Sequence, residues 1–219
     1  MTGPRVRSSH QGLEQGVFVV FEGIDGAGKT TQAFILKEHI EKQGLEAVYV
    51  KEPTSGPWGQ KIKDIARHGR NKISLEEELN YFIFDREEDV RENIRPALDR
   101  RSVVIADRYF YSTIAYQSAL GLDPEEIRAK NAKFPVPDLV ILLDISPELS
   151  RQRITANRKE QANKGYEQLG LLTAVKKAYE TLQDSNIVRL DGRLNIETTA
   201  RQVWDKVEPL LTRRLIRVG

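Results

Sequence analysis

Short apolar segments alternate along the chain with longer segments of helical periodicity. The pattern predicts an α/β fold with three α/β/α layers and a five-stranded parallel sheet covered by helices on both faces. Ligands of such sheets bind at the carboxyl ends of the strands. The apolar runs cover 17–21, 47–50, 102–106, 139–145 and 186–190, and the helical patterns cover 29–43, 58–68, 75–95, 109–120, 147–156, 170–184 and 196–216.

Composition narrows the possible chemistry. The chain has 219 residues and a net charge of only +2, so charge gives no argument for nucleic-acid binding. It has no cysteine and three histidines, which excludes thiolate metal sites and cysteine nucleophiles and leaves oxygen-ligated ions such as Mg²⁺. No apolar stretch reaches the roughly 18 residues of a membrane span. We expect a cytoplasmic protein without membrane contact, with a disordered tail over 1–16 and a single domain over 17–216.

A glycine-rich loop follows the first apolar run. Its sequence, Gly-Ile-Asp-Gly-Ala-Gly-Lys-Thr over 23–30, matches G-x-x-x-x-G-K-[ST] throughout and lies between a strand pattern and a helix pattern. Glycines let successive backbone N–H groups turn toward phosphate oxygens, the lysine reaches the outer phosphates, and the threonine hydroxyl can ligate Mg²⁺. The alternative is a glycine-rich turn without a ligand. The predicted nucleotide-binding residues are Gly23, Gly26, Ala27, Gly28, Lys29, Thr30 and Thr31.

An arginine lies on the apolar stripe of the segment 75–95. Leu79, Ile83 and Val90 fall at helical spacing, and Arg86 is on the same stripe, one turn after Phe82. A charge at an inward position is costly unless it is paired. One interpretation is an arginine held for an anionic ligand beside an aromatic surface for a base. The other is a structural pairing with Asp85, another carboxylate or a backbone carbonyl.

The third apolar run ends in an aspartate followed by an arginine. Asp107 at the tip of a strand beside the phosphate loop can hold Mg²⁺ through water, and Arg108 follows it into the same cleft. Polar groups then recur on one helix face and can contact a nucleobase and its sugar, although ordinary surface residues would give the same pattern. These residues are Ser112, Thr113, Tyr116 and Gln117.

The segment 151–164 is locally basic. It holds five cationic residues against Glu160, which gives a local charge of +4 within a protein of +2. A basic segment at this place can close over a triphosphate and bring arginines to the transferred phosphoryl group. A solvated helix and loop is the alternative. The cationic residues are Arg151, Arg153, Arg158, Lys159 and Lys164.

Taken together, four segments make the chain resemble thymidylate kinases, within the nucleoside monophosphate kinase group of P-loop folds. They are FEGIDGAGKTTQ (21–32), EPTSGPWGQKI (52–62), the F-x-x-D-R pattern over 82–86, and DRYFYSTIAYQ (107–117). The resemblance implies a P-loop kinase fold with a short lid at about 151–165. It also implies transfer of the γ-phosphoryl group of ATP to thymidine monophosphate (dTMP) with Mg²⁺, and a homodimer formed through helices.

The resemblance also implies roles for single residues. Lys29, Arg108, Asp25 and lid arginines would be catalytic, and Thr30, Asp107 and Asp25 would serve the metal. The ATP site would further include Arg151 and the Asp191-Gly192 turn. Phe82 would stack on thymine, Arg86 and Arg108 would meet the acceptor phosphate, and Tyr116 would pack near the deoxyribose. Other acceptor-site positions implied by the resemblance are Glu52, Pro53, Thr113, Gln117 and Glu167.

One position departs from part of the family. Some members carry an arginine inside the phosphate loop, where this chain has Gly26. In members with glycine there, the lid supplies the catalytic arginine, and we favour Arg153 and Arg158 for that role. Two other functions remain open on the sequence alone. A deoxynucleoside kinase would use Glu52 as a base, and a regulatory module would bind ATP without turnover.

Overall fold

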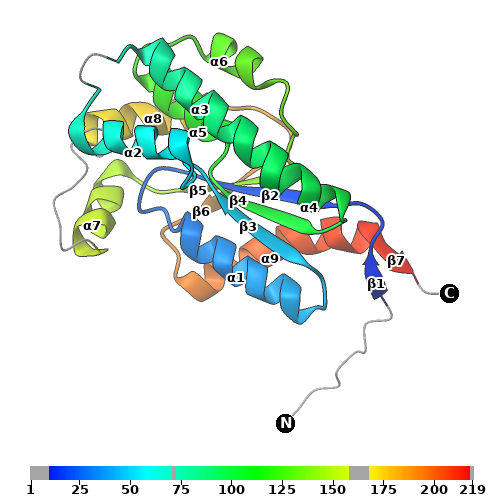
Figure 1. Ribbon diagram of the computed structural model, residues 1–219. Helices are drawn as coiled ribbons and strands as arrows, with labels where there is room; N and C mark the ends of the chain where they lie inside the picture. Colours follow the sequence, from blue (N-terminus) through cyan, green and yellow to red (C-terminus); the bar gives the residue numbers. More distant parts are fainter. Residues whose placement is uncertain (1–9, 71–72, 158–167, 218–219) are drawn as a thin grey trace.

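The computed structural model describes residues 10–70, 73–157 and 168–217. Its centre is a five-stranded parallel sheet with the strand order β3-β4-β2-β5-β6 (Figure 1). The α/β fold with five parallel strands is thereby confirmed. The strands are β2 (Val17–Glu22), β3 (Ala47–Lys51), β4 (Val103–Asp107), β5 (Leu139–Asp144) and β6 (Ile187–Asp191).

Strand β2 lies at the middle of the sheet, and all six of its residues are buried. Both faces of a parallel sheet are covered by helices, which is why this strand is a continuous apolar run rather than an alternating one. The register pairs Phe21 with Asp107 and Asp107 with Lys51. The carboxyl ends of β2, β3 and β4 therefore meet at one edge, where the phosphate loop begins.

Helices cover the sheet on two sides (Figure 1). Helix α1 (Lys29–Lys42) packs against α9 (Ile196–Arg214) on one face. On the other face, α5 (Phe110–Ala119) contacts α3, α6 and α8, and α2 packs on α3. The remaining bounds are α2 (Pro57–His68), α3 (Leu75–Asp89), α4 (Arg95–Asp99), α6 (Pro124–Asn131), α7 (Pro147–Asn157) and α8 (Leu169–Thr181).

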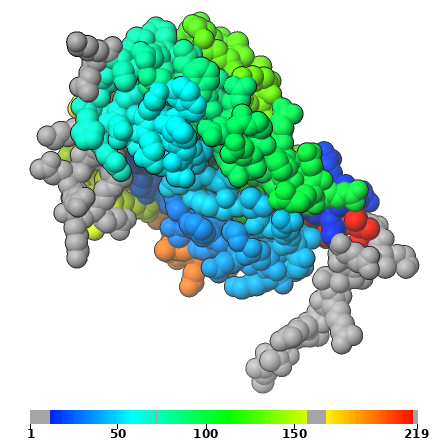
Figure 2. All heavy atoms as spheres, in the orientation of Figure 1, coloured from blue at the N-terminus to red at the C-terminus, as the bar shows by residue number. Residues whose placement is uncertain are grey.

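The two ends of the described chain form a second, two-stranded sheet. Strand β1 (His10–Leu13) pairs antiparallel with β7 (Leu215–Arg217), and Leu13 is only 2% exposed. Figure 2 shows the blue N-terminal and red C-terminal residues side by side at one edge of the molecule. The expectation of a disordered tail over 1–16 is thus wrong for 10–13. Their partner strand lies about 200 residues away and replaces the end of the helix expected to reach 216, so no local pattern reveals the pairing.

Other element boundaries also differ from the sequence pattern. Helix α6 was absent from the expected elements because Ile127 is its one buried apolar residue, and its start depends on the Asp123 side chain, which accepts a hydrogen bond from the Glu125 N–H. The single helix expected over 75–95 ends as α3 at Asp89 and continues as a wider π-helical turn, η1 (Val90–Ile94), before α4. Within the described ranges, no helix combines the length and apolar character that a bilayer crossing requires.

Candidate active site

A cleft of about 470 Å³ opens at the carboxyl ends of β2, β3 and β4. The phosphate loop, the ends of β3 and β4, and helices α2, α3, α5 and α7 contribute to its walls. The sequence motifs that are far apart along the chain therefore meet in one cavity. The lining includes Asp25, Gly26, Gly28, Lys29, Thr30, Thr31, Glu52, Pro53, Phe82, Asp107, Arg108, Tyr116 and Arg153, all expected from sequence, and also Lys51 and Lys63.

Glycine is required at two positions of the phosphate loop by its close contacts. Gly23 has a φ of +134°, and a Cβ atom there would lie 2.5 Å from the Leu143 carbonyl oxygen. Gly26 has a φ of +75°, and a Cβ atom would meet the Ser150 carbonyl oxygen at 3.0 Å. Both values of φ are in the region that L side chains avoid. Helix α7 packs so closely on Gly26 that the arginine found here in some family members would not fit without a shift of this helix.

Lys29, the first residue of α1, is held inside the loop that precedes it. Its ammonium group donates to the carbonyl oxygens of Gly23 at 2.9 Å and Ile24 at 3.0 Å, and the residue is 6% exposed. Burial and the charge of Arg108 lower the pKa of Lys29 to about 8, although Asp25 and Asp107 act in the opposite direction. An anion in the loop would stabilise the charged form and raise this pKa again, so the site favours phosphate electrostatically.

Oxygen donors suited to Mg²⁺ lie together beside Lys29. The Thr30 hydroxyl donates to the Asp107 carboxylate, and the Tyr49 hydroxyl donates to the same oxygen at 3.2 Å. Burial raises the pKa of Asp107, but the charges of Lys29 and Lys51 outweigh it, so its pKa is lowered and the group is anionic. This pair fits Mg²⁺, which usually takes one or two protein oxygens together with phosphates.

Lys51 was not identified from the sequence. Its ammonium group lies 3.2 Å from the Asp107 carboxylate and 3.3 Å from the Thr30 hydroxyl, so it brings a positive charge to the two expected metal ligands. The register of β3 against β4 places it there, because Lys51 pairs directly with Asp107. Only its position at the end of a short apolar strand could have indicated a role.

Arg108 connects the phosphate loop with helix α5. It donates to Asp25 at 2.6 Å and to the Gly23 carbonyl oxygen at 3.1 Å on one side, and to the Ser112 hydroxyl at 2.8 Å on the other. Its guanidinium also lies 5.2 Å from the centre of the Tyr116 ring. Asp25, expected as a metal ligand, is thus engaged with Arg108. The structure therefore supports Thr30 and Asp107 as the neighbouring oxygen donors.

A fully buried carboxylate supports this part of the site from behind. Glu22 accepts from the N–H groups of Tyr109 and Ser112, from the Ser112 hydroxyl at 2.5 Å, and from the Tyr179 hydroxyl at 2.8 Å. Burial raises its pKa and the charge of Arg108 opposes the shift. Glu22 and Tyr179 were not expected from the sequence, since Tyr179 belongs to α8 and lies 67 residues after its partner Ser112.

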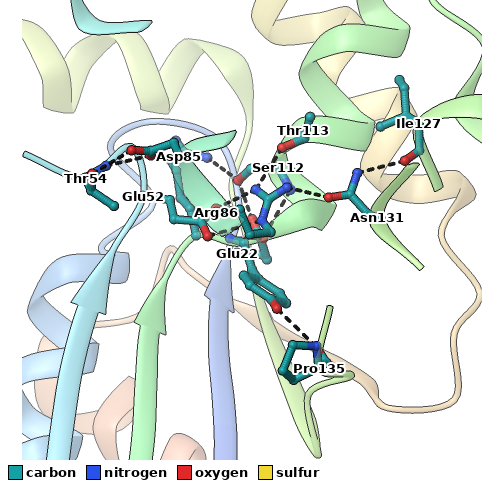
Figure 3. A network of polar contacts seen from close by, with 12 residues as sticks. Glu22, Glu52, Thr54, Asp85, Arg86, Ser112, Thr113, Ile127, Asn131 and Pro135 are labelled. Atoms are coloured by element: carbon teal, nitrogen blue, oxygen red, sulfur yellow. Dashed lines mark hydrogen bonds and ion pairs between the residues drawn. The ribbon is translucent and has the colours of Figure 1, made fainter. Parts of the chain in front are cut away.

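Arg86 forms a buried network instead of facing the cleft (Figure 3). It is 1% exposed and makes a two-pronged contact with Glu52, with its Nε 3.1 Å from one carboxylate oxygen. It also donates to Asn131 at 2.6 Å and to Thr113 at 3.0 Å. The structure therefore does not bring Arg86, which was expected at the acceptor phosphate, to the surface of the cleft. The ion-pair interpretation holds, because a guanidinium this deeply buried requires a partner.

The partner of Arg86 is Glu52 and not Asp85. The Asp85 carboxylate accepts from the backbone N–H of Thr54 at 2.8 Å and from its hydroxyl at 2.5 Å, so it fixes the loop after β3 (Figure 3). Burial raises the pKa of Glu52 above its ordinary value, and the facing guanidinium of Arg86 offsets only part of this rise. Glu52 is only 4% exposed. Its role in the ligand-free protein is to join β3 to α3.

Replacing Glu52 by glutamine is expected to lower the free energy of unfolding by about 2–3 kcal/mol, because an amide offers the buried guanidinium of Arg86 one acceptor oxygen in place of two. Chemical denaturation with a matched Glu46→Gln control measures this. Glu46 is exposed, and its ion pair with Arg100 is long, at 3.7 Å. Equal stability of the two variants would contradict a structural role for the Glu52–Arg86 pair.

The expected acceptor-site residues fall into two groups. Phe82, Tyr116 and Pro53 line the cleft. Thr113 and Gln117 lie behind this wall on α5 and are 2% and 0% exposed. The sequence pattern of α5 therefore identified one face of the helix. In the structure, Ser112 and Tyr116 line the cleft, whereas Thr113 and Gln117 are buried.

Helix α7 carries the described part of the basic segment. Arg153 donates to the carbonyl oxygens of Gly26 at 3.3 Å and Gly192 at 2.9 Å, and thus connects the phosphate loop to the turn after β6. Arg151 is exposed on the same helix, and Asp191 is paired with Arg193. Arg158 and Glu167, with the rest of the expected lid up to residue 165, lie outside the described residues.

Comparison with known proteins agrees with this architecture. The thymidylate kinase family model matches residues 21–203. The chain belongs to the thymidylate kinase family. It is 40% identical over 196 residues to the thymidylate kinase of Desulfotalea psychrophila, which covers 90% of this chain and 96% of that protein. The identity is 41% to the thymidylate kinase of Akkermansia muciniphila, over 89% of this chain and 93% of the relative. The identity to the thymidylate kinase of Xanthomonas campestris is 39%, over 93% of this chain and 88% of the relative.

Proposed function

We propose that the cleft brings ATP and dTMP together, with the triphosphate on the phosphate loop and thymine against Phe82. The activity of the family is that of an ATP-dependent phosphotransferase that converts dTMP to dTDP. The observation that carries the residue assignment is the position of Arg108. It contacts the phosphate loop through Asp25 and Gly23, and the acceptor wall through Ser112. The two phosphates of the reaction would meet at this guanidinium.

The proposed chemistry consists of positioning and charge neutralisation. The acceptor phosphate is largely dianionic at neutral pH and needs no strong general base. Lys29 binds the outer phosphates of ATP, and Arg108 holds the acceptor phosphate in line with the γ-phosphoryl group. When bound at Thr30 and Asp107, Mg²⁺ supplies further neutralisation of the phosphate oxygens. The acceptor phosphate is assigned to Arg108 alone, because Arg86 is occupied by Glu52.

Helix α7 and the segment after it form the proposed lid. Its first residues already contact the phosphate loop, since the Ser150 hydroxyl donates to the Asp25 carbonyl oxygen at 2.6 Å and Arg153 donates to Gly26. Gly26 leaves room for this packing. In this proposal Arg153, and Arg158 beyond the described helix, approach the transferred phosphoryl group when ATP is bound.

The alternative function of a deoxynucleoside kinase would require Glu52 to act as the base. That reaction would need a carboxylate free to accept the proton of a sugar hydroxyl. The carboxylate of Glu52 is bound at both oxygens by Arg86 and is almost completely buried. The alternative of a silent nucleotide-binding module has no support from the site either, because Lys29, Thr30, Asp107 and Arg108 are all in place.

A substrate panel with ATP tests the proposal. We expect turnover of dTMP and none of thymidine, since a nucleoside offers no phosphate to Arg108. Removal of divalent cations with EDTA is expected to stop turnover, and added Mg²⁺ is expected to restore it. A coupled assay for ADP measures both. Phosphorylation of thymidine at the rate of dTMP would refute the assignment of the acceptor site.

The resemblance also supports a homodimer formed through helices, which we propose here. An aromatic cluster on the outer side of α2 and α3 fits such a contact: Trp58 packs against Tyr81 and Phe84, and Phe84 is 41% exposed. Sedimentation velocity distinguishes a 25.0 kDa monomer from a dimer.

A further inference from the structure

Two helices face each other behind the aromatic wall of the cleft. On α3, Glu78, Phe82 and Arg86 follow each other at intervals of four residues and so share a face. On α5, Thr113 and Gln117 are one turn apart. Arg86 donates to Thr113 at 3.0 Å, and the Gln117 side-chain NH₂ donates to Glu78 at 3.3 Å. Phe82, which lines the cleft, lies between Glu78 and Arg86 on α3, so the two cross-connections flank the part of the helix that offers a surface to a base.

Glu78 determines how this amide is oriented. It is 0% exposed, and Arg70 donates to its other carboxylate oxygen through Nε. An ionised carboxylate only accepts hydrogen bonds, and an amide donates through nitrogen and accepts through oxygen. Gln117 must therefore turn Nε2 toward Glu78 and Oε1 away from it.

The amide oxygen of Gln117 is left available. Gln117 is 0% exposed, and within the described part of the chain no hydrogen bond reaches its Oε1. A buried acceptor without a donor is unfavourable, and a ligand N–H would satisfy it. Thymine and uracil carry a donor, N3–H, on the pairing edge. Cytosine carries an acceptor, N3, at the same place.

We infer that Glu78 is a positioning residue for base selection. By accepting from Nε2, it fixes Gln117 in the orientation whose oxygen receives a pyrimidine N3–H and repels the N3 lone pair of cytosine. Burial raises the pKa of Glu78, and the ion pair with Arg70 opposes this rise and so favours the accepting, ionised form. The inference rests on the proposed dTMP site, but it concerns Glu78, which does not line the cleft and was not expected from the sequence to have a role.

The variant Glu78→Gln tests the inference. A glutamine of the same shape can donate or accept, so Gln117 becomes free to turn its NH₂ toward a base. We expect the ratio of kcat/KM for dTMP to that for dCMP to fall by about tenfold or more. The ratio for dTMP to dUMP is expected to stay the same, because both bases carry N3–H. Glu76→Gln, an exposed position on the same helix, is the control and should leave both ratios unchanged.

Ratios between substrates do not depend on the fraction of folded enzyme, so partial destabilisation of the variant does not obscure the result. The rise in unfolding temperature on adding dTMP, dUMP or dCMP measures binding without turnover. In the Glu78→Gln variant, the rise caused by dCMP should approach the rise caused by dTMP. An unchanged dTMP-to-dCMP ratio, or an equal loss for all three nucleotides, would overturn the inference. Failure of the proposed function would look different, because the wild-type protein would then not turn over dTMP.

Discussion

Replacing Lys29 by alanine is expected to reduce kcat/KM for ATP and dTMP by at least about 10³-fold. The side chain is buried within the phosphate loop, where its ammonium group donates to the carbonyl oxygens of Gly23 and Ile24. Alanine removes the positive charge that would meet the outer phosphates. It also leaves two inward carbonyl oxygens without a donor, so the loop itself should bind phosphate less well. Steady-state kinetics with both substrates measures the loss.

The control for this variant is Lys42→Ala at the other end of the same helix. Lys42 is 77% exposed at its side chain and lies 3.7 Å from Glu38, so its removal should leave kinetics unchanged. Circular dichroism and calorimetric titration with ATP separate loss of fold from loss of binding. Near-normal turnover by a folded Lys29→Ala variant would remove the basis for placing ATP on this loop.

Replacing Arg108 by alanine is expected to lower kcat by about 10³-fold, the usual scale for an arginine that stabilises a transferred phosphoryl group. Its guanidinium connects the phosphate loop to α5 through Asp25 and Ser112. Removing it separates the proposed ATP side of the cleft from the proposed acceptor side. Arg108→Lys keeps the charge but not the planar fork of donors, and it should recover only part of the rate. Single-turnover kinetics reports on the chemical step.

The backbone at Arg108 calls for a matched control. Its φ is +76°, a value that also strains alanine. Arg101, an exposed residue in the turn before β4, has a similar φ of +64°. Arg101→Ala therefore reproduces the backbone effect without touching the cleft. Equal kinetic losses in the Arg101 and Arg108 variants would assign the effect to backbone strain, and no loss in either would exclude Arg108 from catalysis.

Local patterns were sufficient for most of the sheet and the phosphate loop. Buried parallel strands are short and wholly apolar, and the glycine-lysine-threonine spacing leaves little freedom in how the loop folds. Patterns were insufficient where the partner is distant. Strand β1 depends on β7 at the other end of the chain. Helix α6 has one buried apolar residue, so its hydrophobic pattern does not differ from that of a polar loop.

The same distinction applies within the site. Lys29, Thr30, Asp107 and Arg108 could be assigned from motifs, since each contact follows from a strand end or a helix start. The burial of Arg86 could also be anticipated, but its acceptors could not. Glu52, Asn131 and Thr113 come from a strand end and two helices, and only the packing of these elements brings them around one guanidinium.

By itself, the sequence determined the α/β fold, the phosphate loop and the family, because these depend on periodicity and on residues that are close along the chain. The tertiary structure decided which polar residues face the cleft and which pair behind it. It paired Arg86, expected at the acceptor phosphate, with Glu52, placed Lys51 beside the expected metal ligands, and connected Glu78 to Gln117. A buried polar group must find its partner in three dimensions, and that partner can come from any part of the chain.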